Sequence, residues 1–302
     1  MIDLWQWGAA GGVVCLGALA AWVLVARRRV HWTAPRLTER RAGLTVRDSG
    51  GAGDCTVVLL HGLAGSGRYF GAEFEALAPE LRVVIPDLLG FARSPRPTDI
   101  GYLVDDHVDA ILGALAEIEV TGDLVVVGHS TGCVLALAVA RAVPERVRAV
   151  VGFGPAVYRD AAHARGRLEG LGLMTRLFLL DSDTGQRMCQ WSCRNRARSA
   201  ALAPLLRPDL PAPIARDGVE HNSYSRTLRH VIVESASLGW LREATYPVHF
   251  VVGSRDEIPD LDALTAASSE LDVVSVEVWP GDHNLPLTDP ERCCQLIRSS
   301  AG

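Results

Sequence analysis

The stretch VVVGHSTG, residues 125–132, places a serine between two glycines at the end of an apolar, β-branched run. Such a run predicts a strand, and residues 133–141 after it are mostly good helix formers. A serine at this kind of junction is typical of a nucleophile elbow, a sharp strand-to-helix turn that exposes the hydroxyl. Glycines two residues before and two residues after remove the Cβ atoms that the turn would crowd. The stretch therefore predicts that Ser130 is a nucleophile.

Further strand-like runs recur along the chain with helical stretches between them. These runs are continuous in Val, Ile and Leu rather than alternating with polar residues, which indicates strands buried on both faces. We therefore expect an α/β fold with a mostly parallel central sheet flanked by helices. In such sheets ligands bind beyond the carboxyl ends of the strands. The predicted strands are Thr56–Leu60, Arg82–Ile85, Leu124–Val127, Val147–Phe153, Val248–Val252 and Val273–Val278.

The composition excludes some classes of function. The chain has 302 residues, an apolar share of 48% and a formal net charge of −5, so it can bury a large core and gives no reason to expect a nucleic-acid partner. All thirty basic residues are Arg. The seven cysteines have neither the rhythm of a disulfide framework nor the spacing of a metal site, so we expect free thiols and no metal.

Characteristic motifs follow the predicted strands. Besides the elbow they are HGLAGSG at 61–67, PDLLGFARS at 86–94, GSRDEIP at 253–259 and PGDHNLP at 280–286. With these motifs in this order, the chain resembles the α/β-hydrolase superfamily from about Leu44 to its C-terminus. The resemblance implies an α/β-hydrolase fold without a cofactor.

The resemblance also implies a catalytic triad in the chain order nucleophile, acid, base. Ser130, Asp256 and His283 match that order, with Glu257 and Asp260 as neighbouring carboxylates that leave the identity of the acid open. A tetrahedral intermediate needs fixed N–H donors, and the resemblance assigns them to the backbone of Leu63 and Thr131. His61 has a structural role in this family. We expect the side chain of His129 to point away from the nucleophile across the turn.

Between about 156 and 243 the strand rhythm stops, and the family commonly inserts a helical cap there over the active site. This cap is expected to set substrate specificity, and its arginines offer a basic face that could meet anionic lipid headgroups. Ordinary helix packing and a genomic preference for Arg account equally well for the same arginines.

We divide the whole chain into an anchor at 1–30, a linker at 31–45 and a hydrolase domain at 46–302.

The first thirty residues form a separate unit. From Leu4 to Ala26 the chain is apolar apart from Gln6, which is long enough for a single transmembrane helix. A cleaved signal peptide is the rival interpretation, but the positive charges at 27–29 follow the apolar stretch instead of preceding it. By the positive-inside rule these charges keep the catalytic domain in the cytoplasm, so we expect a single-pass membrane protein.

These features predict a serine hydrolase that cleaves carboxylic esters, with lipid-derived esters included, through an acyl-enzyme intermediate. Its expected partners are a small ester or acyl substrate and, through the anchor, the membrane. One alternative is another reaction on the same scaffold, namely C–C bond hydrolysis, cofactor-free haloperoxidase or perhydrolase activity, or acyl transfer. A different class of function is a non-catalytic, ligand-binding relative.

Overall fold

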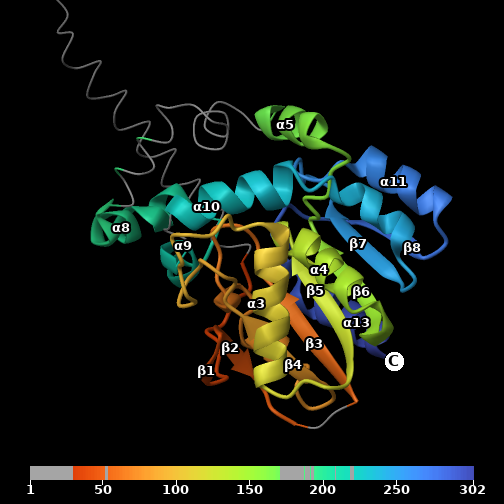
Figure 1. Cartoon of the computed structure of the whole chain (residues 1–302), viewed down its shortest axis with the longest axis horizontal. Coiled ribbons are helices and arrows are strands. Elements are labelled where there is room, and N and C mark those ends of the chain that lie inside the picture. The colour runs from red at the N-terminus through yellow and green to blue at the C-terminus, as the bar shows by residue number, and fades with distance from the viewer. Residues whose placement is uncertain are drawn as a thin grey trace, which may run out of the picture.

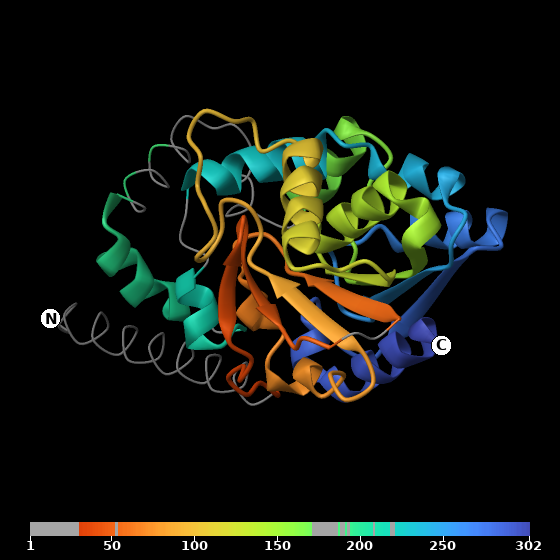
Figure 2. The ribbon, with the colours of Figure 1, turned by 60° about the horizontal axis from the view of Figure 1, so that its bottom comes forward.

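The structure is a computed structural model that describes residues 30–51, 54–170, 187, 191, 194–207, 209–217 and 221–302. The described residues build an eight-stranded sheet with helices on both faces (Figures 1 and 2). The strand order is β1-β2-β4-β3-β5-β6-β7-β8. The strands are β1 Glu39–Ala42, β2 Leu44–Asp48, β3 Cys55–Leu60, β4 Arg82–Pro86, β5 Asp123–His129, β6 Val147–Phe153, β7 Val248–Gly253 and β8 Val274–Trp279.

The six strands from β3 to β8 pair in parallel, as expected for continuous apolar runs. Their bounds lie within two residues of those predicted from the sequence. Parallel pairing brings the carboxyl ends of neighbouring strands to one edge of the sheet. There, Leu60 of β3 pairs with Gly128 of β5, and His129 of β5 pairs with Phe153 of β6. The loops that follow these strands therefore meet at one place.

The predicted linker at 31–45 is wrong in its second half. Residues 39–42 form the edge strand β1, which pairs antiparallel with β2 through a tight turn at Gly43, whose φ is +63°. Antiparallel pairing of β2 with β4 then joins this hairpin to the sheet. The hairpin was missed because both strands are short. β1 (ERRA) is Arg-rich with two of its four residues exposed, and the five residues of β2 (LTVRD) include no continuous apolar run.

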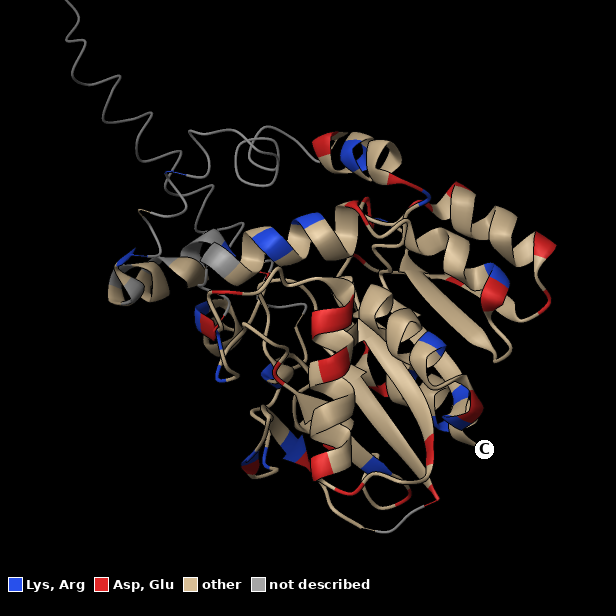
Figure 3. Cartoon of the chain, viewed as in Figure 1, with Lys and Arg blue, Asp and Glu red and all other residues tan. Residues whose placement is uncertain are grey.

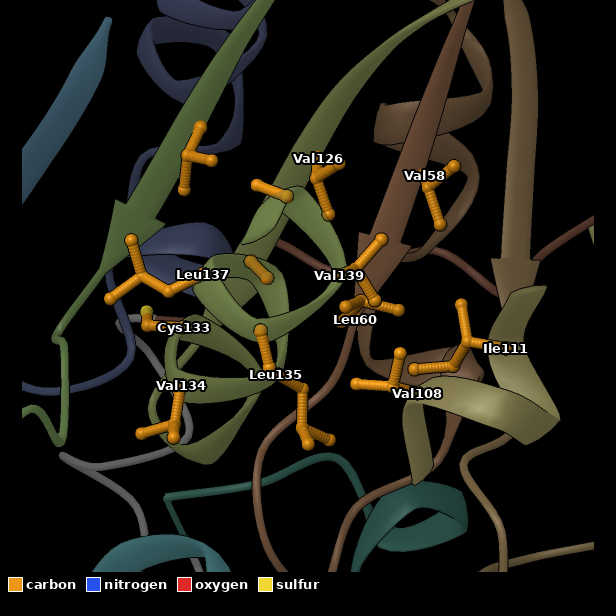
Figure 4. Close-up of a cluster of buried hydrophobic side chains, with 14 of the residues drawn as sticks. Val58, Leu60, Val108, Ile111, Val126, Cys133, Val134, Leu135, Leu137 and Val139 are labelled. Carbon is orange, nitrogen blue, oxygen red and sulfur yellow. The ribbon is translucent and has the colours of Figure 1, made fainter. Parts of the chain in front are cut away.

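Side chains of successive strand residues point to opposite faces, and each face has its own core. One face packs on α3 (Val104–Glu117), α4 (Thr131–Ala142) and α11 (Leu261–Glu270). Figure 4 shows Val58, Leu60 and Val126 meeting α3 and α4 on this face. The other face packs on α2 (Ala72–Glu75) and α13 (Pro290–Ala301). Each fully buried Val or Leu side chain contributes about 1.5–3 kcal/mol, so these layers hold the strand ends rigidly.

Helices fill the described part of the segment between β6 and β7. In Figure 1, α5 and α10 lie above the sheet and α8 and α9 lie at the left of the view, and Figure 3 shows arginines on α5 and around α10. A small apolar cluster, with Tyr158, Leu168 and Ile232 among its members, packs α5 against η3, whereas buried residues of α8 and α9 belong to the core on the α2–α13 face of the sheet. The helices of this segment are α5 Ala161–Gly170, α8 Arg196–Leu206, α9 Ala212–Asp217, α10 His221–Thr227, the π-helix η3 Leu228–Val233 and the 3-10 helix η4 Ser237–Glu243. Short helices elsewhere are η1 Gly67–Tyr69, η2 Pro144–Arg146 and α12 Leu285–Thr288.

The predicted transmembrane segment lies outside the described residues. Within the described ranges, none of the helices combines the length and the apolar character that a membrane crossing requires. The described chain begins at Val30, which packs on the α2–α13 side of the sheet, and the His31 N–H donates to the Leu287 carbonyl at 2.6 Å.

Candidate active site

Ser130 lies at the junction of β5 and α4 in a strained backbone conformation, with φ 55° and ψ −118°. Its N–H donates to the Phe153 carbonyl at 3.0 Å, which ties the turn to the neighbouring strand β6. A Cβ on Gly128 would lie 2.4 Å from the backbone N of Cys133, and one on Gly132 would lie 2.1 Å from the Leu60 carbonyl oxygen. Only glycine fits at these two positions, so the structure has the sharp turn that the sequence predicts.

His283 and Asp256 come together from the loops after β8 and β7. The Nδ1–H of His283 donates to Oδ2 of Asp256 at 2.9 Å. The Asp256 side chain is 1% exposed, whereas that of His283 is 20% exposed. A buried carboxylate on Nδ1 fixes the tautomer of the imidazole, leaves Nε2 free to accept a proton and stabilises the charged ring that results.

The other two carboxylates near Asp256 are used elsewhere. Asp260 is the N-cap of α11, accepting the Ala263 N–H at 3.0 Å, and it pairs with His163 of α5. Glu257 is exposed. Of the three carboxylates that the sequence left open, the structure thus brings Asp256 to the histidine.

The expected oxyanion donors lie on either side of the elbow. Thr131 is the first residue of α4, where backbone N–H groups and the helix dipole favour a negative charge. Leu63 is in the loop after β3, which folds back through the Gly65 N–H bond to the Gly62 carbonyl at 3.1 Å. A Cβ on Gly62 would be only 3.1 Å from the Cβ of Ser130, so this loop packs directly on the elbow.

A cavity of about 270 Å³ joins these groups under the cap. Ser130, His283, Leu63 and Thr131 all line it. The cap and the loops around it contribute mostly apolar side chains, so the cavity suits an acyl or alkyl group. These side chains are Ala156, Leu168, Leu210, Ile214, Leu228, Ile232 and Ile258.

His129 does not point away from the site, contrary to the prediction. Its ring stacks on Tyr69 with centroids 4.4 Å apart and lies 4.8 Å from the ring of His283. Its Nε2–H donates to the His283 carbonyl at 2.9 Å. Burial, followed by the nearby charge of His283, lowers the pKa of His129 well below 6.5, so this ring stays neutral. The His129 side chain thus supports the loop that carries His283. No feature of the sequence pattern indicated this role.

The cap reaches the same loop through Asn284. Tyr69 donates from its hydroxyl to Oδ1 of Asn284 at 3.3 Å, and Nδ2 of Asn284 donates to Asp209 at 3.2 Å. Asp209 in turn pairs with Arg207, which lines the cavity. A hydrogen-bonded path therefore runs from the cap to the residue next to His283. It could not be predicted from sequence patterns because its members are far apart along the chain.

Two polar residues at other strand ends are structural, and for His61 this is the role that the resemblance implied. His61 accepts the Leu88 N–H at Nε2 (3.0 Å) and contacts the Gly62 carbonyl at 2.8 Å, while burial lowers its pKa to about 4. Asp87 accepts the N–H groups of Gly67 at 2.7 Å and Arg93 at 3.1 Å. Both side chains hold loops around the site.

The part of the chain that the structure describes contains no group of three His, Cys, Asp or Glu side chains able to hold a metal ion. The cysteines at 55, 133, 293 and 294 are free and buried.

Comparison with known proteins finds similarity to proteins with the alpha/beta hydrolase fold. Residues 56–181 match the model of the alpha/beta hydrolase fold family. Over 122 residues the chain is 38% identical to Lipase LipV of Mycobacterium tuberculosis, covering 40% of this chain and 45% of that protein. Over 105 residues it is 42% identical to 2-hydroxymuconate semialdehyde hydrolase of a Pseudomonas species, covering 33% and 36%. The matches span less than half the length of these curated relatives.

Among solved structures, E-2-(acetamidomethylene)succinate hydrolase superposes with a TM-score of 0.68 at 21% identity. The superposition covers 87% of this chain and 98% of that one. At this identity the likeness concerns the fold.

Proposed function

We propose that this chain is an enzyme of the alpha/beta hydrolase superfamily, a serine hydrolase that cleaves carboxylic esters. In this proposal Ser130 is the nucleophile, His283 the base and Asp256 the residue that orients the base. The observation that carries it is the Asp256–His283 hydrogen bond beside a strained, cavity-lining Ser130. A pure binding protein has no physical need for these three groups in one cavity.

The reaction follows from these roles. Ser130 Oγ attacks the ester carbonyl while His283 takes its proton at Nε2, and the resulting oxyanion is stabilised by the N–H groups of Leu63 and Thr131. The tetrahedral intermediate collapses as His283 protonates the departing alkoxide, leaving an acyl group on Ser130. Water, activated by His283, then attacks the acyl carbonyl and releases the acid. Each oxyanion donor contributes about 3–4 kcal/mol to the transition state.

The apolar wall of the cavity supports an ester with a hydrocarbon acyl chain, including one derived from a lipid. Similarity to Lipase LipV and to a probable lysophospholipase of Arabidopsis thaliana, BODYGUARD 4, favours the same class. The second candidate is hydrolysis of a C–C bond in a diketone-like compound. Similarity to the 2-hydroxymuconate semialdehyde hydrolase favours it, and the same three residues would serve.

A panel of p-nitrophenyl esters with acyl chains of increasing length tests the proposal, together with labelling by a fluorophosphonate. We expect hydrolysis and labelling by the wild type, and neither by Ser130→Ala. Ser254→Ala is the matched control, because Ser254 is an exposed serine at the end of β7 outside the cavity. Labelling without hydrolysis of any ester would favour the C–C bond candidate. The absence of both would contradict the hydrolase proposal.

We also propose that the segment 1–30 anchors the enzyme to a membrane with the catalytic domain in the cytoplasm. The length and apolar character of this segment support the anchor, and the three arginines after it support the orientation. Deleting residues 1–29 retains Val30 and its packing on the core, so we expect a folded enzyme that moves from the membrane to the soluble fraction. Continued sedimentation of the truncated enzyme with membranes would contradict the anchor.

A further inference from the structure

Arg207 interrupts an otherwise uncharged cavity wall. Among the described residues that line the cavity it is the sole Arg, Lys, Asp or Glu. Its backbone is fixed on both sides, since its N–H donates to the Ala203 carbonyl at 2.9 Å and its carbonyl accepts the Leu210 N–H at 3.1 Å. The guanidinium is also near enough to His129 to contribute to the lowered pKa of that ring. A guanidinium therefore lies in the wall of the cavity that Ser130 also lines.

The side chain of Arg207 is held by one edge only. Its Nε donates to Asp209 Oδ1 at 2.9 Å and its Nη2 donates to Oδ2 at 2.8 Å, so Asp209 occupies the side edge of the guanidinium. Nη1 makes no hydrogen bond within the described part of the chain, and 46% of the side chain is exposed. The end edge, formed by Nη1 and the second hydrogen of Nη2, is free to bind two oxygens of a carboxylate side by side.

Asp209 is itself held in place. Nδ2 of Asn284 donates to its Oδ2 at 3.2 Å, so the carboxylate receives hydrogen bonds both from the cap and from the loop of His283. Hydrogen bonds and charge from Arg207 outweigh its burial and lower the pKa of Asp209, which keeps this carboxylate ionised and the guanidinium oriented. Both partners of the ion pair are partly exposed, and the bond from Asn284 to Asp209 ties the pair to the loop of His283.

We propose that Arg207 binds a carboxylate at the far end of the acyl group, so that the preferred substrates are esters of dicarboxylic acids with one free carboxylate. This inference rests on the proposed ester hydrolysis. The apolar side chains that line the same cavity would accommodate the methylene chain, and the guanidinium would provide the interaction by which the enzyme prefers such an acyl group over a neutral one of equal length. The alternative role for Arg207, holding the cap loop through Asp209 alone, predicts no such discrimination.

The test compares two esters of similar length, mono-p-nitrophenyl glutarate, which carries a free carboxylate, and p-nitrophenyl pentanoate, which is neutral. The measured quantity is the ratio of their kcat/KM values in the full-length enzyme. We expect Arg207→Gln to lower this ratio by about tenfold or more, mainly through the KM of the glutarate ester, because a charge-assisted, two-point contact is lost. An unchanged ratio in Arg207→Gln would overturn the inference.

Two further variants complete the test. Arg207→Lys keeps the charge but loses the planar fork, so we expect an intermediate ratio, which a purely structural role would not produce. Arg216→Gln removes an exposed cap arginine on α9 that does not line the cavity, and we expect the wild-type ratio.

A binding measurement separates this inference from the proposed function. In Ser130→Ala, which has no nucleophile, glutarate is expected to raise the melting temperature, and the added Arg207→Gln change is expected to abolish that rise. If the wild type cleaves neither ester, the hydrolase proposal fails while this measurement still decides the carboxylate site. A rise that persists without Arg207, or no rise with it, would refute the site.

Discussion

At the scale of single residues, the site depends on which carboxylate reaches His283. Three lie within five positions along the chain, and their types alone do not distinguish them. The structure does, since Asp256 is buried against His283 while Asp260 caps α11. A buried acceptor on Nδ1 stabilises the charged imidazole far more than an exposed carboxylate, because little solvent screens it.

We therefore expect Asp256→Asn to lower kcat by about 10³- to 10⁴-fold, since the amide favours the wrong tautomer of His283. Asp260→Asn is the matched control, because asparagine is also a good N-cap and the change leaves Asp256 in place. Steady-state kinetics of both variants on the best ester check this prediction. Equal losses in the two variants would contradict the role given to Asp256.

At the scale of elements, the elbow depends on close packing between the ends of β3 and β5 and the start of α4. The Leu60 carbonyl of β3 lies where a Cβ of residue 132 would be, so the helix approaches the strand more closely than any side chain permits. This contact fixes the direction in which α4 leaves the turn and, with it, the position of the Thr131 N–H.

Gly132→Ala should accordingly reduce the free energy of unfolding by about 3 kcal/mol, because backbone atoms on both sides must shift. Gly113→Ala is a matched control in the exposed part of α3, where no atom lies within 4 Å of the added Cβ. We expect this change to be stabilising by about 0.5–1 kcal/mol, since alanine favours a helix. Urea denaturation measures both. An unchanged free energy of unfolding in Gly132→Ala would contradict the close contact between α4 and the end of β3.

At the scale of the whole molecule, buried neutral histidines couple the fold to pH. Burial lowers the pKa of His61 and of His107 to about 4, from an ordinary value of 6.5. His107 lies in α3 and contacts Thr227 Oγ1 in the cap at 3.1 Å. Between pH 6.5 and pH 4 the unfolded chain binds more protons than the folded one, so the stability from these groups is complete above pH 6.5 and declines as the pH falls.

As the pH falls from 6.5 to 5, each of these two histidines takes up a proton in the unfolded chain but not in the folded one. We expect this to reduce the free energy of unfolding by about 2 kcal/mol for each histidine. Burial raises the pKa of Asp87 and Asp217, so protonation of these carboxyls in the folded state opposes the trend at the acid end of the range. His107→Gln should remove the contribution of His107 to the pH dependence of the free energy of unfolding. His31→Gln, at an exposed position, should leave that pH dependence unchanged. Denaturation at pH 7, 6 and 5 checks this, and an equal slope in all three proteins would contradict it.

Much of the fold could be predicted from the sequence, because the six parallel strands are buried on both faces and buried strands require continuous apolar residues. The β1–β2 hairpin escaped prediction because β1 lies at the sheet edge, where polar side chains are tolerated, and β2 has only five residues, two of them charged. The elbow glycines could be identified in advance since the sharp turn leaves no alternative. The orientation of His129 could not, because it depends on stacking against Tyr69, which is 60 residues away.

By itself the sequence determined the strand order along the chain, the nucleophile elbow at Ser130 and the class of fold, since these depend on local backbone demands and on burial. The tertiary structure alone decided that Asp256 is the carboxylate on His283, that His129 supports the loop of that base and that Arg207 faces the cavity. These relations join residues from separate strands, loops and cap helices. Their distances are set by how the layers pack, and no short stretch of sequence encodes them.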